Sequence, residues 1–211
     1  MKHIIFDLDG TLIDSMPVWR GTGAAFLQKH GFPVPENLVD IVKTQTIWQT
    51  AEYFRDVLGV PMEPKAIVED IISYVVDEYR YHIPLKPFAG EYLAKMAREG
   101  AKMCILTASE ADYIVPALER LDIKKYFSCI LTCTELGEYK EDGKAYLTAM
   151  ERLGGTLADT VVFEDALYAV KGAKQAGFPV YAMLDEIREK DLEKIAALAD
   201  KFFYSYEEIM E

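Results

Sequence analysis

The sequence predicts an α/β protein whose core is a Rossmann-like parallel sheet, with a small all-helical segment inserted after the first strand. Two observations predict the core: short apolar runs alternate with amphipathic stretches, and glycines follow the last apolar positions of several of these stretches. A third observation predicts the insert, because residues 15 to about 86 contain no convincing strand pattern. We therefore expect a core made of residues 1–14 and 87–211 and a helical insert made of residues 15–86.

Five apolar runs are typical of buried parallel strands because they are compact and lack clean polar alternation. They read HIIFDL, AKMCILT, CILT, TVVFED and PVYAML in chain order. Amphipathic stretches between them predict helices over residues 88–99, 110–121, 142–153 and 166–176. Strands and helices that alternate in this way indicate a parallel sheet with helices on both faces.

Helical periodicity also marks the insert. Apolar residues recur at three- and four-residue spacing from Ile67 to Tyr79, and Pro64 suits the first turn of that helix. A second periodic stretch over residues 47–58 ends before Gly59. Prolines at positions 84 and 87 flank the return to the core, as expected at a boundary.

Composition limits the possible partners. The chain has 211 residues, of which 51% are hydrophobic and 27% are charged, and this balance is typical of a soluble globular protein. Its net charge of −12 argues against nucleic acid and anionic membranes as partners. No run is long enough to span a bilayer, and the N-terminus lacks a secretory pattern, so we expect a cytoplasmic protein. A monomer is the expected state.

The three cysteines, Cys104, Cys129 and Cys133, lie in or beside apolar runs. An odd number of cysteines without a second matching pair favours reduced, buried thiols over a disulfide or a metal site.

Carboxylates gather where the predicted strands end. Asp7 and Asp9 close the first strand, and Glu164 and Asp165 close the fourth. Because ligands of open parallel sheets bind beyond the carboxyl ends of the strands, these groups are expected to meet at one edge. Converging carboxylates need a counter-charge, and hard oxygen ligands suit Mg²⁺. We expect the Asp7 and Asp165 carboxylates and the Asp9 carbonyl to bind the ion, with Glu164 as a ligand or a support.

Hydrogen-bond donors are expected at the same edge. The second strand ends with Thr107 and Ala108. The Thr107 hydroxyl and the backbone amides that follow it are expected to bind an anion. Lys140, which follows the third strand, adds a positive charge.

These motifs resemble the haloacid dehalogenase superfamily of hydrolases, in particular the subgroup that contains beta-phosphoglucomutase and phosphoglycolate phosphatase, which carries a helical cap. The first motif of that superfamily stands here as FDLDGT, starting at Phe6, and the resemblance covers nearly the whole chain. Thr107 matches the second motif, and Glu164 with Asp165 matches the acidic fourth motif. Lys140 matches the third motif; the proline that often follows that lysine is absent, and Lys144 is the alternative.

The resemblance implies a Mg²⁺-dependent phosphatase that hydrolyses a small phosphate monoester through an aspartyl-phosphate. Asp7 would be the nucleophile, and Lys140 would neutralise charge on the transferring group. Asp9 would protonate the leaving oxygen and then activate water. Dehalogenases of the superfamily lack an aspartate at the position of Asp9, so this residue favours phosphoryl chemistry.

The resemblance also gives the helical insert a role, because it stands where the superfamily has a small cap that closes over the site. A closing cap favours small phosphorylated metabolites as substrates. Ser15, Trp19 and Lys43, together with residues 44–46, are candidates for substrate recognition.

Three alternatives stay open. A sugar-phosphate mutase like beta-phosphoglucomutase shares both aspartates, although its cap histidine would fall at Trp19 in this chain. A non-catalytic protein that binds a phosphorylated ligand would normally have lost a catalytic carboxylate. A phosphonate hydrolase would need a lysine that forms an imine, for which Lys43 is the candidate.

Overall fold

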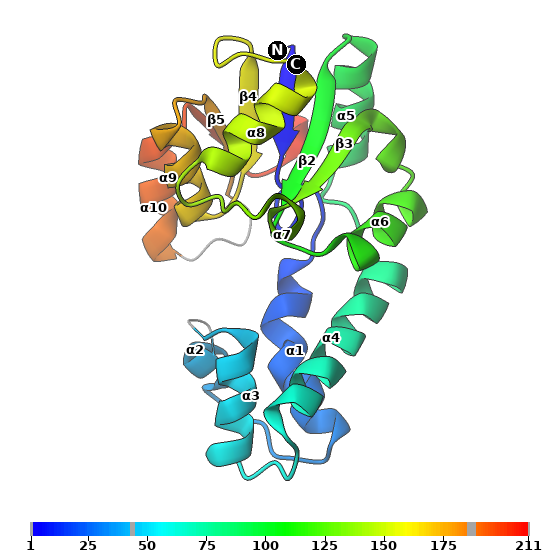
Figure 1. Ribbon diagram of the computed structural model, residues 1–211, viewed down its shortest axis with the longest axis vertical. Helices are drawn as coiled ribbons and strands as arrows, with labels where there is room; N and C mark the ends of the chain where they lie inside the picture. The colour runs from blue at the N-terminus through cyan, green and yellow to red at the C-terminus, as the bar shows by residue number, and fades with distance from the viewer. Residues whose placement is uncertain (1, 43–44, 185–188, 211) are drawn as a thin grey trace. The chain divides into compact units, whose positions relative to one another are not determined.

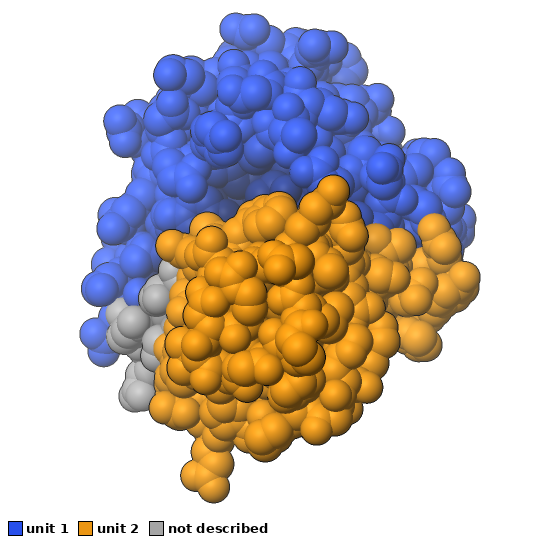
Figure 2. Space-filling view, turned by 60° about the horizontal axis from the view of Figure 1, so that its bottom comes forward, with its two compact units in different colours: residues 1–14, 84–211 blue, residues 15–83 orange. Residues whose placement is uncertain are grey.

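The computed structural model describes residues 2–42, 45–184 and 189–210, which fall into two compact units (Figures 1 and 2). Unit 1 comprises residues 1–14 and 84–211, and unit 2 comprises residues 15–83. Unit 1 contains all the strands of the described chain, whereas the regular elements of unit 2 are all helices.

The chain leaves and re-enters unit 1 through two paired segments. The Asp14 amide donates a hydrogen bond to the Pro84 carbonyl at 2.9 Å, and the Lys86 amide donates to the Leu12 carbonyl at 2.9 Å. The buried Lys86 ammonium donates to Asp14 Oδ1 at 2.8 Å. These bonds explain why residues 84–86, which the sequence analysis assigned to the insert, belong to unit 1.

Unit 1 is built on one parallel sheet of six strands in the order β3-β2-β1-β4-β5-β6. The strands are β1 (His3–Phe6), β2 (Lys102–Thr107), β3 (Phe127–Thr132), β4 (Thr160–Glu164), β5 (Val180–Met183) and β6 (Lys201–Phe203). This order confirms the predicted α/β fold. The sequence analysis did not predict β6, because this strand has only three residues and two of them are exposed.

Helices connect the strands, as the alternating pattern predicted. They are α5 (Ala89–Arg98), α6 (Ala111–Arg120), α7 (Cys133–Leu136), α8 (Lys144–Leu153), α9 (Leu167–Gln175) and α10 (Glu189–Leu198). Two short 3₁₀ helices, η1 (Lys124–Tyr126) and η2 (Tyr206–Ile209), complete the unit. The helix α10 was not among the predicted elements.

Each face of the sheet is covered by its own apolar layer. On one face, α8, α9 and α10 cover the sheet, and Ile5 packs in one cluster with Tyr146, Val170 and Ile195 (Figure 1). The other face holds an aromatic group, in which the ring centroids of Phe6 and Phe163 lie 4.7 Å apart. Strands buried on both faces explain why the predicted runs lack polar alternation.

In residues 15–42 and 45–83, unit 2 has four helices: α1 (Met16–Lys29), α2 (Leu38–Val42), α3 (Ile47–Asp56) and α4 (Pro64–Tyr81). Their shared core includes Phe26 and Phe54, whose rings stack with centroids 5.5 Å apart. The start of α3 is fixed by a capping box, in which Thr46 and Gln49 bond each other's backbone amide. A helical unit with its own core matches the periodicity that predicted the insert.

No helix of the described chain is both long enough and apolar enough to cross a membrane.

Candidate active site

The carboxyl ends of β1, β2 and β4 carry the polar residues that the sequence analysis selected. Asp7 directly follows β1, Thr107 is the last residue of β2, and Glu164 is the last residue of β4, with Asp165 next. The parallel arrangement places these chain ends at one edge of the sheet, where open α/β sheets bind ligands.

A tight turn after β1 brings Asp9 back beside Asp7. The Asp7 amide donates to the Phe163 carbonyl at 2.9 Å, which extends the pairing of β1 with β4. The Leu12 amide then donates to the Leu8 carbonyl at 2.9 Å, closing the turn. Gly10 adopts φ +82°, a conformation that residues with a side chain rarely adopt. The turn after β1 therefore favours glycine at this position of FDLDGT.

Lys140 lies between two carboxylates at the centre of the site. Its Nζ donates to Asp7 Oδ1 at 2.5 Å and to Glu164 Oε1 at 2.7 Å. The exposed fractions of Lys140, Asp7 and Glu164 are 2%, 6% and 1%. Burial opposes the charged form of Lys140, but the two carboxylates outweigh it and raise the pKa of this lysine. Lys140 is therefore a fixed positive charge beside Asp7.

Glu164 is saturated with hydrogen bonds. Besides Lys140, its Oε1 accepts a bond from the Tyr146 hydroxyl at 2.7 Å. Its Oε2 accepts from the Asp165 amide at 3.1 Å. Tyr146 is fully buried in α8 and was not among the predicted site residues. Because both oxygens already accept donors, Glu164 is better suited to orienting Lys140 than to binding a ligand.

Two glycines allow the loop that carries Lys140 to pack closely on α9. A Cβ added at Gly172 of α9 would lie 1.8 Å from the Lys140 carbonyl oxygen, far inside ordinary contact. A Cβ added at Gly143 would lie 2.6 Å from the Gly172 carbonyl oxygen, and Gly143 also has φ +79°. The sequence analysis did not select either glycine, since glycines that permit close backbone approach have no signature in a single sequence.

The acidic groups fit a divalent cation. Asp7, Glu164 and Asp165 each offer a carboxylate oxygen within 4.8 Å of the others. Burial and the neighbouring Glu164 raise the pKa of Asp7 to about 7, although Lys140 opposes the shift. Burial and the Asp7 charge also raise the pKa of Asp165. Asp7 Oδ2 is buried and accepts no hydrogen bond from the described residues. An unpartnered carboxylate oxygen among acidic groups suits an ion with oxygen ligands, which Asp7 and Asp165 would hold.

Two hydroxyl groups orient Asp9 from the end of β2. Ser109 Oγ donates to Asp9 Oδ2 at 2.7 Å, and Thr107 Oγ1 donates to the same oxygen at 3.3 Å. Thr107 Oγ1 in turn accepts the Ser109 amide at 3.0 Å. Ala108 between them is exposed. Ser109, two residues beyond the run AKMCILT, was not among the predicted site residues.

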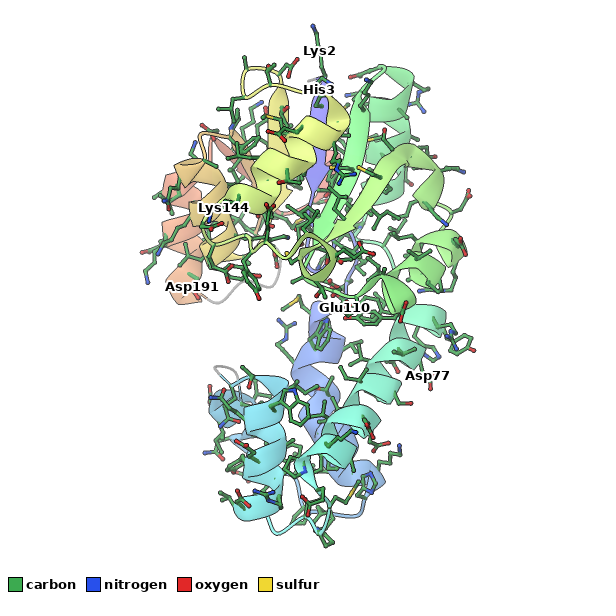
Figure 3. The ribbon with its side chains drawn as sticks, in the orientation of Figure 1. Lys2, His3, Asp77, Glu110, Lys144 and Asp191 are labelled. Carbon is green, nitrogen blue, oxygen red and sulfur yellow. The ribbon has the colours of Figure 1, made fainter. Side chains whose placement is uncertain are left out.

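The remaining candidate residues lie in other settings. Lys144, labelled in Figure 3, starts α8 with an exposed side chain that pairs with Asp142 at 3.0 Å. Ser15 is buried and immediately precedes α1. Trp19 Nε1 donates to the Tyr79 hydroxyl at 2.9 Å, so its indole packs within unit 2. Lys43 lies outside the described residues, as does Thr44.

The chemistry of the described site follows from these contacts. Asp7 combines a free carboxylate oxygen with a neighbouring ammonium group, which suits a nucleophile that attacks an anionic centre. Asp9, two residues further on, accepts hydrogen bonds from two hydroxyl groups. The site therefore combines a carboxylate with an unpartnered oxygen, a second carboxylate, a buried ammonium group and acidic residues close enough to share an ion.

The chain as a whole is similar to known proteins. A protein-family model described as haloacid dehalogenase-like hydrolase matches residues 4–183. A phosphorylated carbohydrates phosphatase from Thermotoga maritima is 26% identical over 205 residues, covering 90% of this chain and 88% of the relative. A phosphoglycolate phosphatase from Thiobacillus denitrificans is 27% identical over 191 residues, covering 87% of this chain and 83% of the relative. The solved structure of a candidate beta-phosphoglucomutase from Thermotoga maritima has a TM-score of 0.86 at 22% identity, covering 96% of this chain and 94% of that one.

Proposed function

This chain belongs to the haloacid dehalogenase-like hydrolase family and is a phosphatase, and from that premise we propose that it hydrolyses the phosphate monoester of a small metabolite with Mg²⁺ bound and Asp7 as the nucleophile. The relatives named above support a small phosphorylated carbohydrate or carboxylic acid as the substrate class. Unit 2 stands in the chain where the family resemblance implies a helical cap.

The first half of the proposed reaction is a displacement at phosphorus. A carboxylate oxygen of Asp7 attacks the phosphorus atom while the bond to the ester oxygen breaks, and Asp9 donates a proton to that leaving oxygen. The Lys140 ammonium, 2.5 Å from Asp7 Oδ1, offsets negative charge where the anionic substrate meets the carboxylate. The product of this half is an aspartyl-phosphate on Asp7 and a free alcohol.

The second half returns the enzyme to its starting state. Asp9, now ionised, takes a proton from a water molecule that attacks the phosphorus of the aspartyl-phosphate. Thr107 and the backbone amides near Ala108 are the proposed donors to the phosphate oxygens. The Ser109 hydroxyl holds Asp9 in place between the two proton transfers, because a Thr107 hydroxyl that donates to the phosphate no longer donates to Asp9.

A Mg²⁺ ion held by Asp7 and Asp165 would neutralise charge on the phosphate group. The Asp9 carbonyl is the further proposed ligand. The unpartnered Asp7 Oδ2 and the raised pKa values of Asp7 and Asp165 support a cation at this place. Glu164 supports the site through Lys140.

The mutase alternative has less support from the described residues. A cap histidine could exchange a proton with Asp9, but the corresponding position holds Trp19, whose indole is a hydrogen-bond donor only. Its N–H already donates to Tyr79. Product analysis with a sugar 1-phosphate separates the activities, because a mutase yields an isomer and a phosphatase yields free phosphate.

The unpartnered, buried oxygen of Asp7 carries the proposal, and its replacement tests it. Asp7→Asn keeps the shape of the side chain but removes the nucleophilic charge, so we expect loss of Mg²⁺-dependent phosphate release from an aryl phosphate. Asp112→Asn is the matched control, since Asp112 is exposed in the first turn of α6, and its turnover should stay unchanged. Wild-type turnover in folded Asp7→Asn would refute the assignment.

A second experiment addresses the intermediate. Asp9→Asn should slow hydrolysis of the aspartyl-phosphate, because no carboxylate is left to take the proton from water. Intact-mass measurement after rapid quenching, followed by peptide mapping, should then find a phosphoryl group on Asp7. A phosphoryl group on another residue would contradict the proposed mechanism.

A further inference from the structure

Two cysteines that the proposed reaction does not use form a pair within the sheet. Cys104 of β2 and Cys129 of β3 are register partners in neighbouring parallel strands. Partner side chains of parallel strands point to the same face, and both residues belong to the apolar cluster that includes Leu153 of α8. Each thiol also alters the acidity of the other. The two side chains are therefore neighbours in the folded sheet.

The two thiols differ in accessibility and in acidity. Cys104 is fully buried, whereas Cys129 lies on the edge strand β3 and is partly exposed. The neighbouring Cys104 thiol lowers the pKa of Cys129 to about 7 against the opposing effect of burial, and Arg152 contributes in the same direction. The same contact, together with burial, raises the pKa of Cys104. An accessible thiolate beside a buried thiol is the arrangement of an attacking and a resolving cysteine.

We propose that Cys104 and Cys129 form a reversible redox site, which a peroxide converts to an intramolecular disulfide. The Cys129 thiolate attacks one oxygen of hydrogen peroxide, the O–O bond breaks, and protonation of the departing oxygen gives water and a sulfenic acid. The Cys104 sulfur then attacks the Cys129 sulfur, its proton passes to the leaving hydroxide, and a second water is released. Two thiols are oxidised by two electrons, and one peroxide is reduced to two waters.

After a register shift between Met103 and Cys104, β2 pairs regularly with β3 from Cys104 to Thr107, and the spacing of paired strands is compatible with a disulfide. Neighbouring strands lie about 4.8 Å apart, which falls within the range of about 4.4–6.8 Å between the Cα atoms of disulfide-bonded cysteines. Cys133, at the start of α7, is buried, and burial raises the pKa of its thiol. The chain thus contains an internal control cysteine that should resist oxidation.

Thiol mapping on the full-length wild-type protein tests the proposal without any substitution. The reduced protein is treated with hydrogen peroxide, alkylated under denaturing conditions and analysed by peptide mass spectrometry. We expect a peptide pair linked through Cys104 and Cys129, a loss of two hydrogen atoms from the intact mass, and an alkylated Cys133. Dithiothreitol should restore all the thiols. A Cys133 that oxidises as fast as Cys129, or disulfides only between chains, would overturn the proposal.

Native labelling and two variants sharpen the test. Cys129 should react with iodoacetamide on the order of tenfold faster than Cys133, because it is more exposed and its thiolate is more populated. Cys133→Ala should still form the linked peptide pair. In Cys104→Ala, Cys129 should oxidise more slowly, because the contact that lowers its pKa is lost, and dimedone should trap the sulfenic acid that forms. Equal labelling of Cys129 and Cys133 in the native wild type would count against the proposal even if a variant failed to fold.

Discussion

Replacing Gly172 by alanine should displace Lys140 and thereby slow the reaction. The added Cβ would lie 1.8 Å from the Lys140 carbonyl oxygen, whereas ordinary contact begins at 3.4 Å, so the loop must recede by about 1.6 Å. The nearest atoms are all backbone, at Lys140 and Glu141, so rotation of a side chain cannot relieve the contact. A shift of this size would lengthen the bonds of 2.5 and 2.7 Å from Lys140 Nζ beyond hydrogen-bond distance.

The expected magnitude follows from the same displacement. A catalytic group moved by about 1 Å costs roughly 100-fold in rate, so kcat for an aryl phosphate should fall by about this factor. Overpacking of this kind costs about 1–3 kcal/mol of folding free energy, partly offset by the better helix propensity of alanine. Kinetics and thermal melts of Gly172→Ala therefore measure two separate effects. Gly21→Ala in α1 is the matched control, because its added Cβ meets nothing within 4 Å.

A double-mutant cycle distinguishes positioning from general damage. If Gly172 acts through Lys140, then Gly172→Ala should add little to the loss of kcat already caused by Lys140→Ala. Full additivity in the cycle would refute the reasoning. An undiminished kcat in Gly172→Ala would do so as well, since it would mean that the loop adapts without moving the ammonium group.

Four further outcomes are expected. In the metal-free protein, the pKa of Asp7 is about 7 in the folded state and 3.8 in the unfolded state. The folded state therefore binds the proton more tightly, and the unfolding free energy should fall as pH rises between these two values, by at most about 4 kcal/mol. Mg²⁺ should therefore raise the melting temperature more at about pH 8 than at about pH 5, and equal shifts would contradict this. Glu164→Gln should lower the pKa of Asp7 in the metal-free protein because it removes a repelling charge, as an NMR titration would detect. Tyr206→Phe should lower the free energy of unfolding by about 1 kcal/mol, because the Tyr206 hydroxyl donates to the Thr11 carbonyl at 3.2 Å. An unchanged midpoint of chemical denaturation would argue against that bond.

Local sequence patterns were sufficient to predict most of the fold. The runs that became β1, β2, β4 and β5 are mostly buried on both faces, so length and composition alone identify them, whereas β3 is an edge strand that is only partly buried. By contrast, β6 is a three-residue edge strand with Lys201 and Phe202 exposed, so its composition does not indicate a strand. Its pairing with β5 stabilises it instead. Short edge strands lack a local signal because their stability comes from a neighbour.

Sequence by itself determined which acidic residues stand at the ends of strands. Asp7 and Asp165 follow directly after runs whose apolar character fixes them in a parallel sheet, and parallel connections bring such ends to one edge. Contacts between distant segments distinguish Lys140 from Lys144, which are four residues apart on one stretch of chain. Lys140 is buried between two carboxylates, whereas Lys144 is exposed, and the close approach of the Lys140 loop to Gly172 accompanies that difference. Burial of a particular ammonium group depends on contacts between segments far apart in sequence, which no local pattern encodes.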